Sequence, residues 1–136
     1  MSECSILFID DDEIDHRLYR YYMSLYADEG THATYAPTVA HAVEELQERE
    51  FDLVFVDHRM PPFNDFRETV SVLKPFVRAA TVYVITGSPL DKRFNDALAY
   101  GAAGVIEKHA MRDTFRPGFV DRLRVISEPK PKPTSH

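Results

Sequence analysis

The chain has 136 residues, of which 44% are hydrophobic and 28% are charged, and its formal charge at pH 7 is −6. This length and composition predict one globular domain with a substantial core, and they exclude a fibre or a disordered chain. The acidic balance disfavours the basic surface that binding to a nucleic-acid backbone requires, so we expect no nucleic-acid partner.

Along the chain, short apolar stretches alternate with longer segments of helical periodicity. The expected strands span 6–10, 31–36, 53–57, 82–86 and 105–107, and the expected helices span 13–27, 38–49, 65–74, 90–100 and 117–127. Such alternation is typical of parallel strands connected by right-handed helical crossovers. Five such units predict an α/β protein of the flavodoxin-like (βα)5 type, a doubly wound parallel sheet with strand order 2-1-3-4-5. Ligands of this fold bind beyond the carboxyl ends of the strands.

Residues that start or stop helices support several of these boundaries. Ser88 as an N-cap and Pro89 at the first helical position are expected to begin the fourth helix, and Gly101 is expected to end it. Pro75 is expected to end the third helix early, because proline lacks the backbone N–H that a helix interior needs.

The two ends of the chain carry no membrane or export signal that we can identify. No apolar run approaches the roughly 20 residues that span a bilayer, and the start MSECS lacks the pattern of a signal peptide. Cys4 is the only cysteine, so we expect a cytoplasmic protein with no membrane contact. We assign residues 1–127 to the folded domain and the polar, proline-rich residues 128–136 to a disordered tail.

The helix expected over 13–27 carries two stripes of apolar and aromatic residues at helical spacing. The first stripe, which we expect to face the core, consists of Ile14, Leu18, Tyr21 and Leu25. The second consists of Tyr19, Tyr22, Met23 and Tyr26. This second stripe either covers the edge of the helix with its hydroxyl groups in water or forms a docking surface for a partner protein.

Acidic residues follow two of the apolar strands at the point where each strand ends. The first strand runs into Asp10 and Asp11 in SILFIDDDE, and the third ends on Asp57 in DLVFVDHRMPP. Because the carboxyl ends of parallel strands lie at one edge of the sheet, Asp57 should approach Asp10 and Asp11. Crowded carboxylates repel one another unless a cation joins them, and such a cluster of oxygen ligands suits Mg²⁺.

The ends of the last two strands add a hydroxyl group and an ammonium group. Thr86 precedes Gly87 in VYVITGS, where a ligand can approach the backbone closely, and Lys108 follows the apolar GVI segment and Glu107. A lysine ammonium binds a phosphoryl oxygen as a point charge. A carboxylate nucleophile, a cation site, a hydroxyl and a lysine together suit phosphoryl transfer, which depends on positioning and on charge neutralisation.

The ordered motifs ILFIDDDE, LVFVDHRMPP, VITGS and GAAGVIEKHA resemble the receiver domain of bacterial two-component response regulators. The resemblance covers residues 4 to about 126, and with no effector domain expected it points to a single-domain regulator of the chemotaxis type. It implies a signalling protein that receives a phosphoryl group from a histidine kinase or a histidine phosphotransfer protein. By this resemblance the chain is not an enzyme. The implied partners also include a downstream target protein, with a homodimer as a further expectation.

The resemblance implies a role for each matching residue. Asp57 corresponds to the phosphoacceptor, Thr86 to the hydroxyl that moves toward the phosphoryl group, and Lys108 to the lysine that pairs with it. The implied cofactor is Mg²⁺, with Mn²⁺ as an alternative. Its implied ligands are Asp10, Asp11, Asp57 and the backbone carbonyl of Arg59.

Three positions depart from the family pattern. Val105 stands where the family commonly has an aromatic ring that turns inward, so we expect the Thr86 loop and the fourth helix to carry the conformational change instead. His109 replaces the proline that usually follows a cis bond after the lysine, and we expect a trans bond here. Asp65 stands where the family often has glycine.

Two other functions fit part of the sequence. A haloacid-dehalogenase-type phosphatase would use Asp10 as its nucleophile and Asp12 as its general acid, but Asp57 would then have no role. A pseudo-receiver would keep the fold as an interaction module that is not phosphorylated. Val105 and His109 are compatible with that alternative, whereas the complete set of active-site residue types argues against it.

Overall fold

The computed structural model describes residues 3–88 and 92–124, and in this part of the chain five strands form one parallel sheet in the order β2-β1-β3-β4-β5. The strands are β1 (Cys4–Ile9), β2 (Thr31–Ala36), β3 (Leu53–Asp57), β4 (Thr81–Thr86) and β5 (Gly104–Glu107). The α-helices are α1 (Glu13–Tyr26), α2 (Val39–Glu48), α3 (Phe66–Val77), α4 (Met111–Thr114) and α5 (Phe119–Leu123). The predicted fold class and strand order are confirmed.

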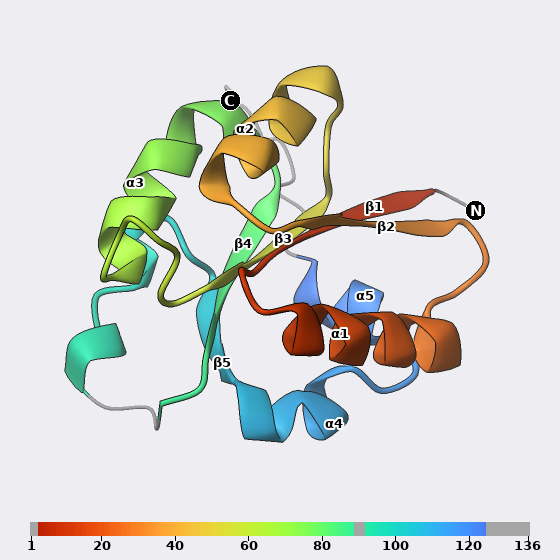
Figure 1. Ribbon diagram of the computed structural model, residues 1–136. Coiled ribbons are helices and arrows are strands. Elements are labelled where there is room, and N and C mark those ends of the chain that lie inside the picture. Colours follow the sequence, from red (N-terminus) through yellow and green to blue (C-terminus); the bar gives the residue numbers. More distant parts are fainter. Residues whose placement is uncertain (1–2, 89–91, 125–136) are drawn as a thin grey trace, which may run out of the picture.

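Helices cover both faces of the sheet (Figure 1). On one face, α2 and α3 pack against Leu7 and Ile9 of β1, and on the other face α1, α4 and α5 pack against Ile6 and Phe8. Successive residues of a strand point to opposite faces. The inner strands therefore read as continuous apolar runs, because each of their faces is buried under helices.

The core on the α1 side is built around the ring of Phe8, which is fully buried. This ring stacks on Tyr19 with the ring centroids 4.5 Å apart, on Phe55 at 5.1 Å and on Tyr35 at 5.5 Å. Aromatic rings in such offset arrangements contribute stability beyond the area that they bury. This cluster joins α1 to the middle of the sheet.

The predicted buried face of α1 is confirmed at Leu18, which packs against the core, and is wrong at the other three positions. Ile14, Tyr21 and Leu25 are 72%, 57% and 49% exposed, whereas Tyr19 and Met23 are buried. The helix is turned so that its second stripe, which we had assigned to an edge or a docking surface, faces the core. The physical reason is a hydrogen bond: the Tyr19 hydroxyl donates to the carboxylate of Asp10, which follows β1, so this polar side chain can occupy the buried face.

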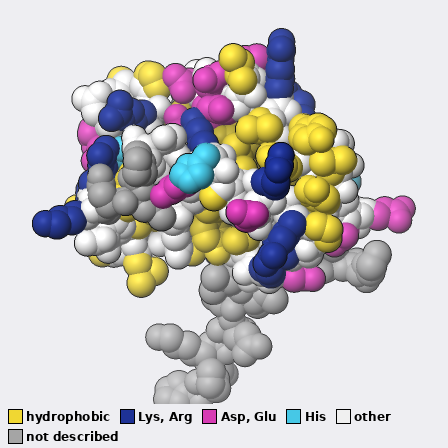
Figure 2. Space-filling model, turned by 90° about the horizontal axis from the view of Figure 1, so that it is seen from below, with side chains coloured by type: hydrophobic (Ala, Val, Ile, Leu, Met, Phe, Trp, Pro, Cys, Tyr) yellow, Lys and Arg dark blue, Asp and Glu magenta, His cyan; other side chains and the backbone are white. Residues whose placement is uncertain are grey.

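The face formed by α1, α4 and α5 consequently keeps a group of accessible hydrophobic side chains, with Lys, Arg and acidic side chains among them (Figure 2). The large hydrophobic residues that α1 exposes are Ile14, Tyr21 and Leu25. Their spacing of seven and four residues places them on one side of α1.

Helix α3 passes through Pro75 and continues to Val77, which contradicts the predicted stop at that proline. Pro75 lies in the last turn, where its missing N–H removes a single intrahelical hydrogen bond. Phe76 and Val77 beyond it pack against the hydrophobic core, and this burial offsets the loss.

The segment between β4 and β5 was predicted to be a helix over 90–100, and the structure differs there. Its described residues form two short 3₁₀ turns, Lys92–Phe94 and Leu98–Tyr100, and Pro89 lies outside the described residues. Phe94 and Ala97 are buried against the core, and Gly101 ends the second turn with φ 105°, as predicted for a helix stop. Burial of these two side chains anchors the segment without a continuous helix.

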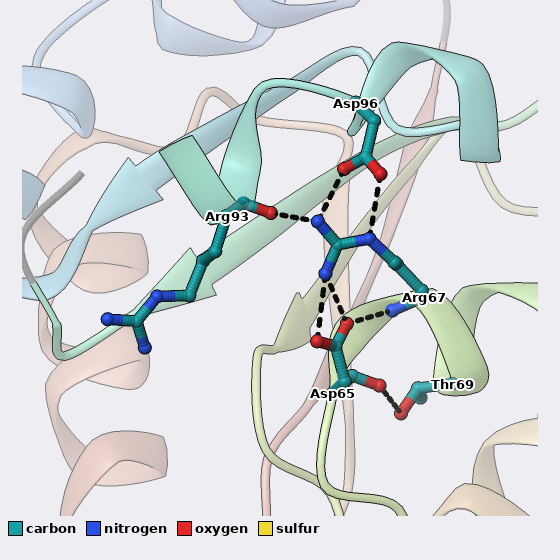
Figure 3. Close-up of polar contacts among 5 residues, drawn as sticks. All are labelled: Asp65, Arg67, Thr69, Arg93 and Asp96. Carbon is teal, nitrogen blue, oxygen red and sulfur yellow. Dashed lines mark hydrogen bonds and ion pairs between the residues drawn. The ribbon is translucent and has the colours of Figure 1, made fainter. Parts of the chain in front are cut away.

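The Arg67 side chain ties this segment to the start of α3 (Figure 3). Its guanidinium donates to both carboxylate oxygens of Asp96, at 2.8 and 2.7 Å, and its Nη2 also donates to the backbone carbonyl of Arg93. On the other side it binds both oxygens of Asp65 at 3.0 and 2.8 Å. Asp65 is also the N-cap of α3, accepting from the Arg67 backbone N–H, so the residue at this position has a structural role.

The C-terminal part also differs from the prediction. The helix expected over 117–127 is observed as α5, which begins after Gly118, and a short helix α4 precedes it unpredicted. Residues 125–136, which include the expected tail, lie outside the described residues. In the described ranges the cis peptide bond is Pro61–Pro62, so the bond between Lys108 and His109 is trans, as predicted. None of the helices in those ranges is long and apolar enough to cross a bilayer.

Replacing Phe8 by alanine should lower the free energy of unfolding by about 3–5 kcal/mol, because the substitution leaves a cavity between three aromatic rings. Urea unfolding followed by circular dichroism measures the change. Leu98→Ala is the control, since Leu98 is 78% exposed and its truncation should change the free energy by no more than about 0.5 kcal/mol. Equal effects of the two substitutions would contradict the assigned core.

Candidate functional site

The ends of β1, β3, β4 and β5 bring the predicted residues to one edge of the sheet. Ile9 pairs with Val56, so the next residues along the two strands, Asp10 and Asp57, are adjacent. Asp10, Asp11 and Asp57 each offer a carboxylate oxygen, and these oxygens lie within 4.8 Å of one another. The predicted acidic cluster is therefore present in the structure.

Asp10 is a fully buried carboxylate. One of its oxygens accepts a hydrogen bond from the Asp12 backbone N–H at 2.9 Å, and the other accepts one from the Tyr19 hydroxyl at 2.6 Å. Burial raises the pKa of Asp10, while these two hydrogen bonds and the charge of Lys108 lower it. Since both carboxylate oxygens already have donors, Asp10 is held in one orientation.

Asp57 is 8% exposed and lines a pocket together with Lys108. Burial and the nearby charge of Asp10 raise its pKa to about 6, against the opposing charge of Lys108. The Lys108 ammonium lies 3.1 Å from the Asp57 carboxylate. The deprotonated form of a carboxylate is the one that can act as a nucleophile.

Lys108 has three carboxylate neighbours, and the nearest was not predicted. Its Nζ lies 2.5 Å from Asp15, 3.1 Å from Asp57 and 3.6 Å from Asp10. Burial alone would lower the pKa of Lys108, but the hydrogen bond to Asp15 and the charges of Asp57 and Asp10 raise it above its usual range. The lysine is therefore charged at any physiological pH.

Thr86 and Arg59 line the same pocket as Asp57. The pocket has a volume of about 210 Å³ and is formed by Asp57, His58, Arg59, Thr86, Gly87, Ser88 and Lys108. Thr86 is fully buried, and its hydroxyl oxygen accepts a hydrogen bond from the Ser88 backbone N–H at 3.0 Å. A donor hydrogen of this hydroxyl remains available for a ligand in the pocket.

His58, next to Asp57 in sequence, faces away from solvent. Its ring packs against Phe94, with the centroids 5.0 Å apart, and against Phe66 at 5.8 Å, and burial lowers its pKa. Its backbone N–H donates to the Ile85 carbonyl at 2.7 Å. His58 therefore links the pocket directly to the segment between β4 and β5.

The residues present fit a divalent metal ion. Asp11 is exposed at the edge of the cluster, so its carboxylate is free to take a place in a hydrated coordination sphere, and Asp57 faces it. Mg²⁺ keeps several water molecules and is usually bound by one or two carboxylates. Asp10, Asp11 and Asp57 supply carboxylates of this kind at one point.

Comparison with known proteins agrees with this geometry. The sequence matches the family described as "Response regulator receiver domain" over residues 6–117. The alginate biosynthesis transcriptional regulatory proteins AlgB of Pseudomonas putida and Pseudomonas syringae pv. tomato are 32% and 30% identical to it over 122 residues. These residues are 88% of this chain and 26% of each relative, so the chain spans about a quarter of the length of these curated relatives.

A solved structure shows the same fold. The chemotaxis response regulator CheY4 of Vibrio cholerae superimposes with a TM-score of 0.67 and 19% sequence identity. The match covers 88% of this chain and 94% of that chain.

Replacing Asp57 by asparagine should stabilise the metal-free protein near pH 7 by about 1–3 kcal/mol. The pKa of Asp57 is about 6 in the folded protein and 3.8 ordinarily. Between these values the folded state binds a proton that the unfolded state has lost, so stability falls as the pH rises through this window. Urea unfolding near pH 7 and below pH 3.8 measures the difference, which should disappear at the lower pH. A less stable variant near pH 7 would contradict this assignment.

Tyr19→Phe should weaken Mg²⁺ binding several-fold and lower the free energy of unfolding by about 1–3 kcal/mol, because the buried Asp10 carboxylate loses a donor. Isothermal titration with Mg²⁺ and urea unfolding give the two values. Tyr21→Phe is the matched control, since Tyr21 is exposed on the same helix. Unchanged Mg²⁺ affinity in Tyr19→Phe would show that Asp10 is fixed without the tyrosine hydroxyl.

Proposed function

Because the chain belongs to the response regulator receiver domain family, we propose that it accepts a phosphoryl group on Asp57 in a Mg²⁺-dependent reaction. Receiver domains are parts of signalling proteins that partner with histidine kinases, and they are not catalytic enzymes. The phosphatase alternative with Asp10 as nucleophile is therefore wrong. The observation that carries the proposal is a buried carboxylate in a small pocket with a lysine ammonium 3.1 Å away.

In the proposed reaction, a carboxylate oxygen of Asp57 attacks the phosphorus of a phosphohistidine on the donor protein. An O–P bond forms, the N–P bond breaks, and the imidazole nitrogen leaves with the electron pair and takes up a proton. A bound Mg²⁺, or Mn²⁺ as the alternative, would neutralise charge on the phosphoryl oxygens. Its proposed ligands are Asp11, Asp57 and the Arg59 backbone carbonyl, with Asp10 at the same cluster.

Lys108 and Thr86 are the proposed partners of the phosphoryl oxygens. Lys108 lies close enough to Asp57 to bind an oxygen of the aspartyl phosphate as a point charge. The Thr86 hydroxyl lines the same pocket and would donate its hydrogen to a phosphoryl oxygen, while its oxygen can keep accepting from the Ser88 backbone N–H. The loop at Thr86 then changes with the state of Asp57.

The output of the switch is proposed to run through the segment after β4. Val105 packs against the core without an aromatic ring to turn. In its place, Phe94 of the first 3₁₀ turn contacts His58, which follows Asp57 directly. A change at Asp57 or Thr86 therefore reaches this segment through contacts that already exist.

The proposed partners are a histidine kinase or histidine phosphotransfer protein as the donor and a downstream target protein that distinguishes the two states of the switch. A ligand shifts such an equilibrium only by its difference in affinity for the two states. The proposed location is the cytoplasm.

Incubation with acetyl phosphate and Mg²⁺ should add the mass of one phosphoryl group, which intact-protein mass spectrometry detects. Asp57→Ala should gain no mass, since it lacks the nucleophile. Removing Mg²⁺ with a chelator should abolish the gain in the parent chain. If neither acetyl phosphate nor phosphoramidate modifies the protein at any Mg²⁺ concentration, the non-phosphorylated interaction module becomes the better interpretation.

A further inference from the structure

The carboxylate closest to Lys108 belongs to Asp15, a residue outside the predicted site. The Lys108 Nζ lies 2.5 Å from an oxygen of Asp15, against 3.1 Å for Asp57. The Asp15 and Lys108 side chains are 15% and 24% exposed, so this contact is largely shielded from water. A shielded, charge-assisted hydrogen bond is much stronger than a surface ion pair.

The position of Asp15 is fixed by the start of α1. Asp12 caps the helix by accepting from the Ile14 backbone N–H at 2.8 Å, and His16 Nε2 contacts the Asp10 carbonyl oxygen at 2.5 Å. Tyr19, one turn further along, binds the Asp10 carboxylate. These contacts on both sides of Asp15 hold the first turn of α1 against the end of β1, so Asp15 cannot move freely away from the lysine.

An alternative role for an acid in the first turn of a helix is simply to complement the helix dipole. Glu13 is an example of an acid in that situation. Glu13 and Asp15 both lie in the first turn of α1. The Glu13 side chain is 69% exposed and forms a 3.5 Å ion pair with Arg20, which is also accessible. Asp15 differs in being only 15% exposed and in binding the lysine that the proposed reaction uses.

We infer that Asp15 is a positioning residue that holds the Lys108 ammonium on the α1 side of the pocket and competes with the phosphoryl group on Asp57 for it. This inference rests on the proposed function, in which Lys108 must bind a phosphoryl oxygen. In the resting state the ammonium donates a hydrogen bond to Asp15 and lies 3.1 Å from Asp57 and 3.6 Å from Asp10, so its charge is shared among three carboxylates. Asp15 therefore biases the switch toward its unmodified state.

Beryllofluoride, whose beryllium becomes tetrahedral when it bonds to a carboxylate oxygen, is the probe that tests this competition at equilibrium in the presence of Mg²⁺. Amide chemical shifts report the fraction bound. Asp15→Asn keeps the size and a hydrogen-bond acceptor but removes the charge, so its apparent Kd for beryllofluoride should be about tenfold lower than that of the parent chain. Glu13→Gln removes one charge from the same helix turn and should leave the Kd unchanged.

The route through Lys108 is tested by a double-mutant cycle. In a Lys108→Ala background, Asp15→Asn should have no further effect on the Kd, because the ammonium for which Asp15 and the bound anion compete is absent. If Asp15 instead only helps to place the lysine for the phosphoryl group, Asp15→Asn will raise the Kd, as Lys108→Ala does, and the inference is overturned.

The remaining outcomes separate this inference from the proposed function. An unchanged Kd in Asp15→Asn, with binding to the parent chain and none to Asp57→Ala, overturns the inference alone. Absence of beryllofluoride binding in the parent chain, Asp15→Asn and Glu13→Gln alike overturns the proposed function and the inference with it.

Discussion

The geometry of the site depends on one desolvated carboxylate, that of Asp10. Its side chain is removed from water, so its charge must be compensated within the protein, and the donors are the backbone N–H of Asp12 and the hydroxyl of Tyr19. Asp12 is the N-cap of α1 and Tyr19 lies within this helix, so both donors belong to α1 and its cap. The bonds that stabilise the carboxylate therefore also set the rotation of the helix about its axis. That rotation brings Asp15 to Lys108, so the electrostatics of the pocket and the packing of α1 have a common origin.

The parts of the site that follow strand ends could be predicted from the sequence. A parallel sheet aligns the carboxyl ends of its strands, and this leaves Asp10, Asp57, Thr86 and Lys108 little freedom to be elsewhere. The face of α1 could not be predicted from hydrophobicity, which ranks tyrosine below leucine. A tyrosine whose hydroxyl has a buried partner packs as well as an apolar residue, and Tyr19 is in that situation.

The remaining errors concern contacts between residues far apart in the chain. Arg67 and Asp96 are separated by 29 positions, and Asp15 and Lys108 by 93. Local patterns of apolar and capping residues contain no information about such pairs. The segment between β4 and β5 has helical periodicity, yet its conformation is held by a guanidinium from another helix. Asp65 likewise could be recognised as a departure from a family pattern, but its role as the cap of α3 and partner of Arg67 required the tertiary structure.

The contacts of Arg67 have a consequence for how the segment between β4 and β5 responds to its surroundings. The side chains of Arg67, Asp65 and Asp96 are 25%, 33% and 43% exposed, so dissolved ions reach them. At physiological ionic strength charges are screened over about 8 Å, and this distance shortens as salt is added. The same segment rests on His58, which follows Asp57 in the chain, through Phe94. Its attachment to α3 is therefore expected to weaken as the ionic strength rises, so that salt concentration acts on a segment close to Asp57.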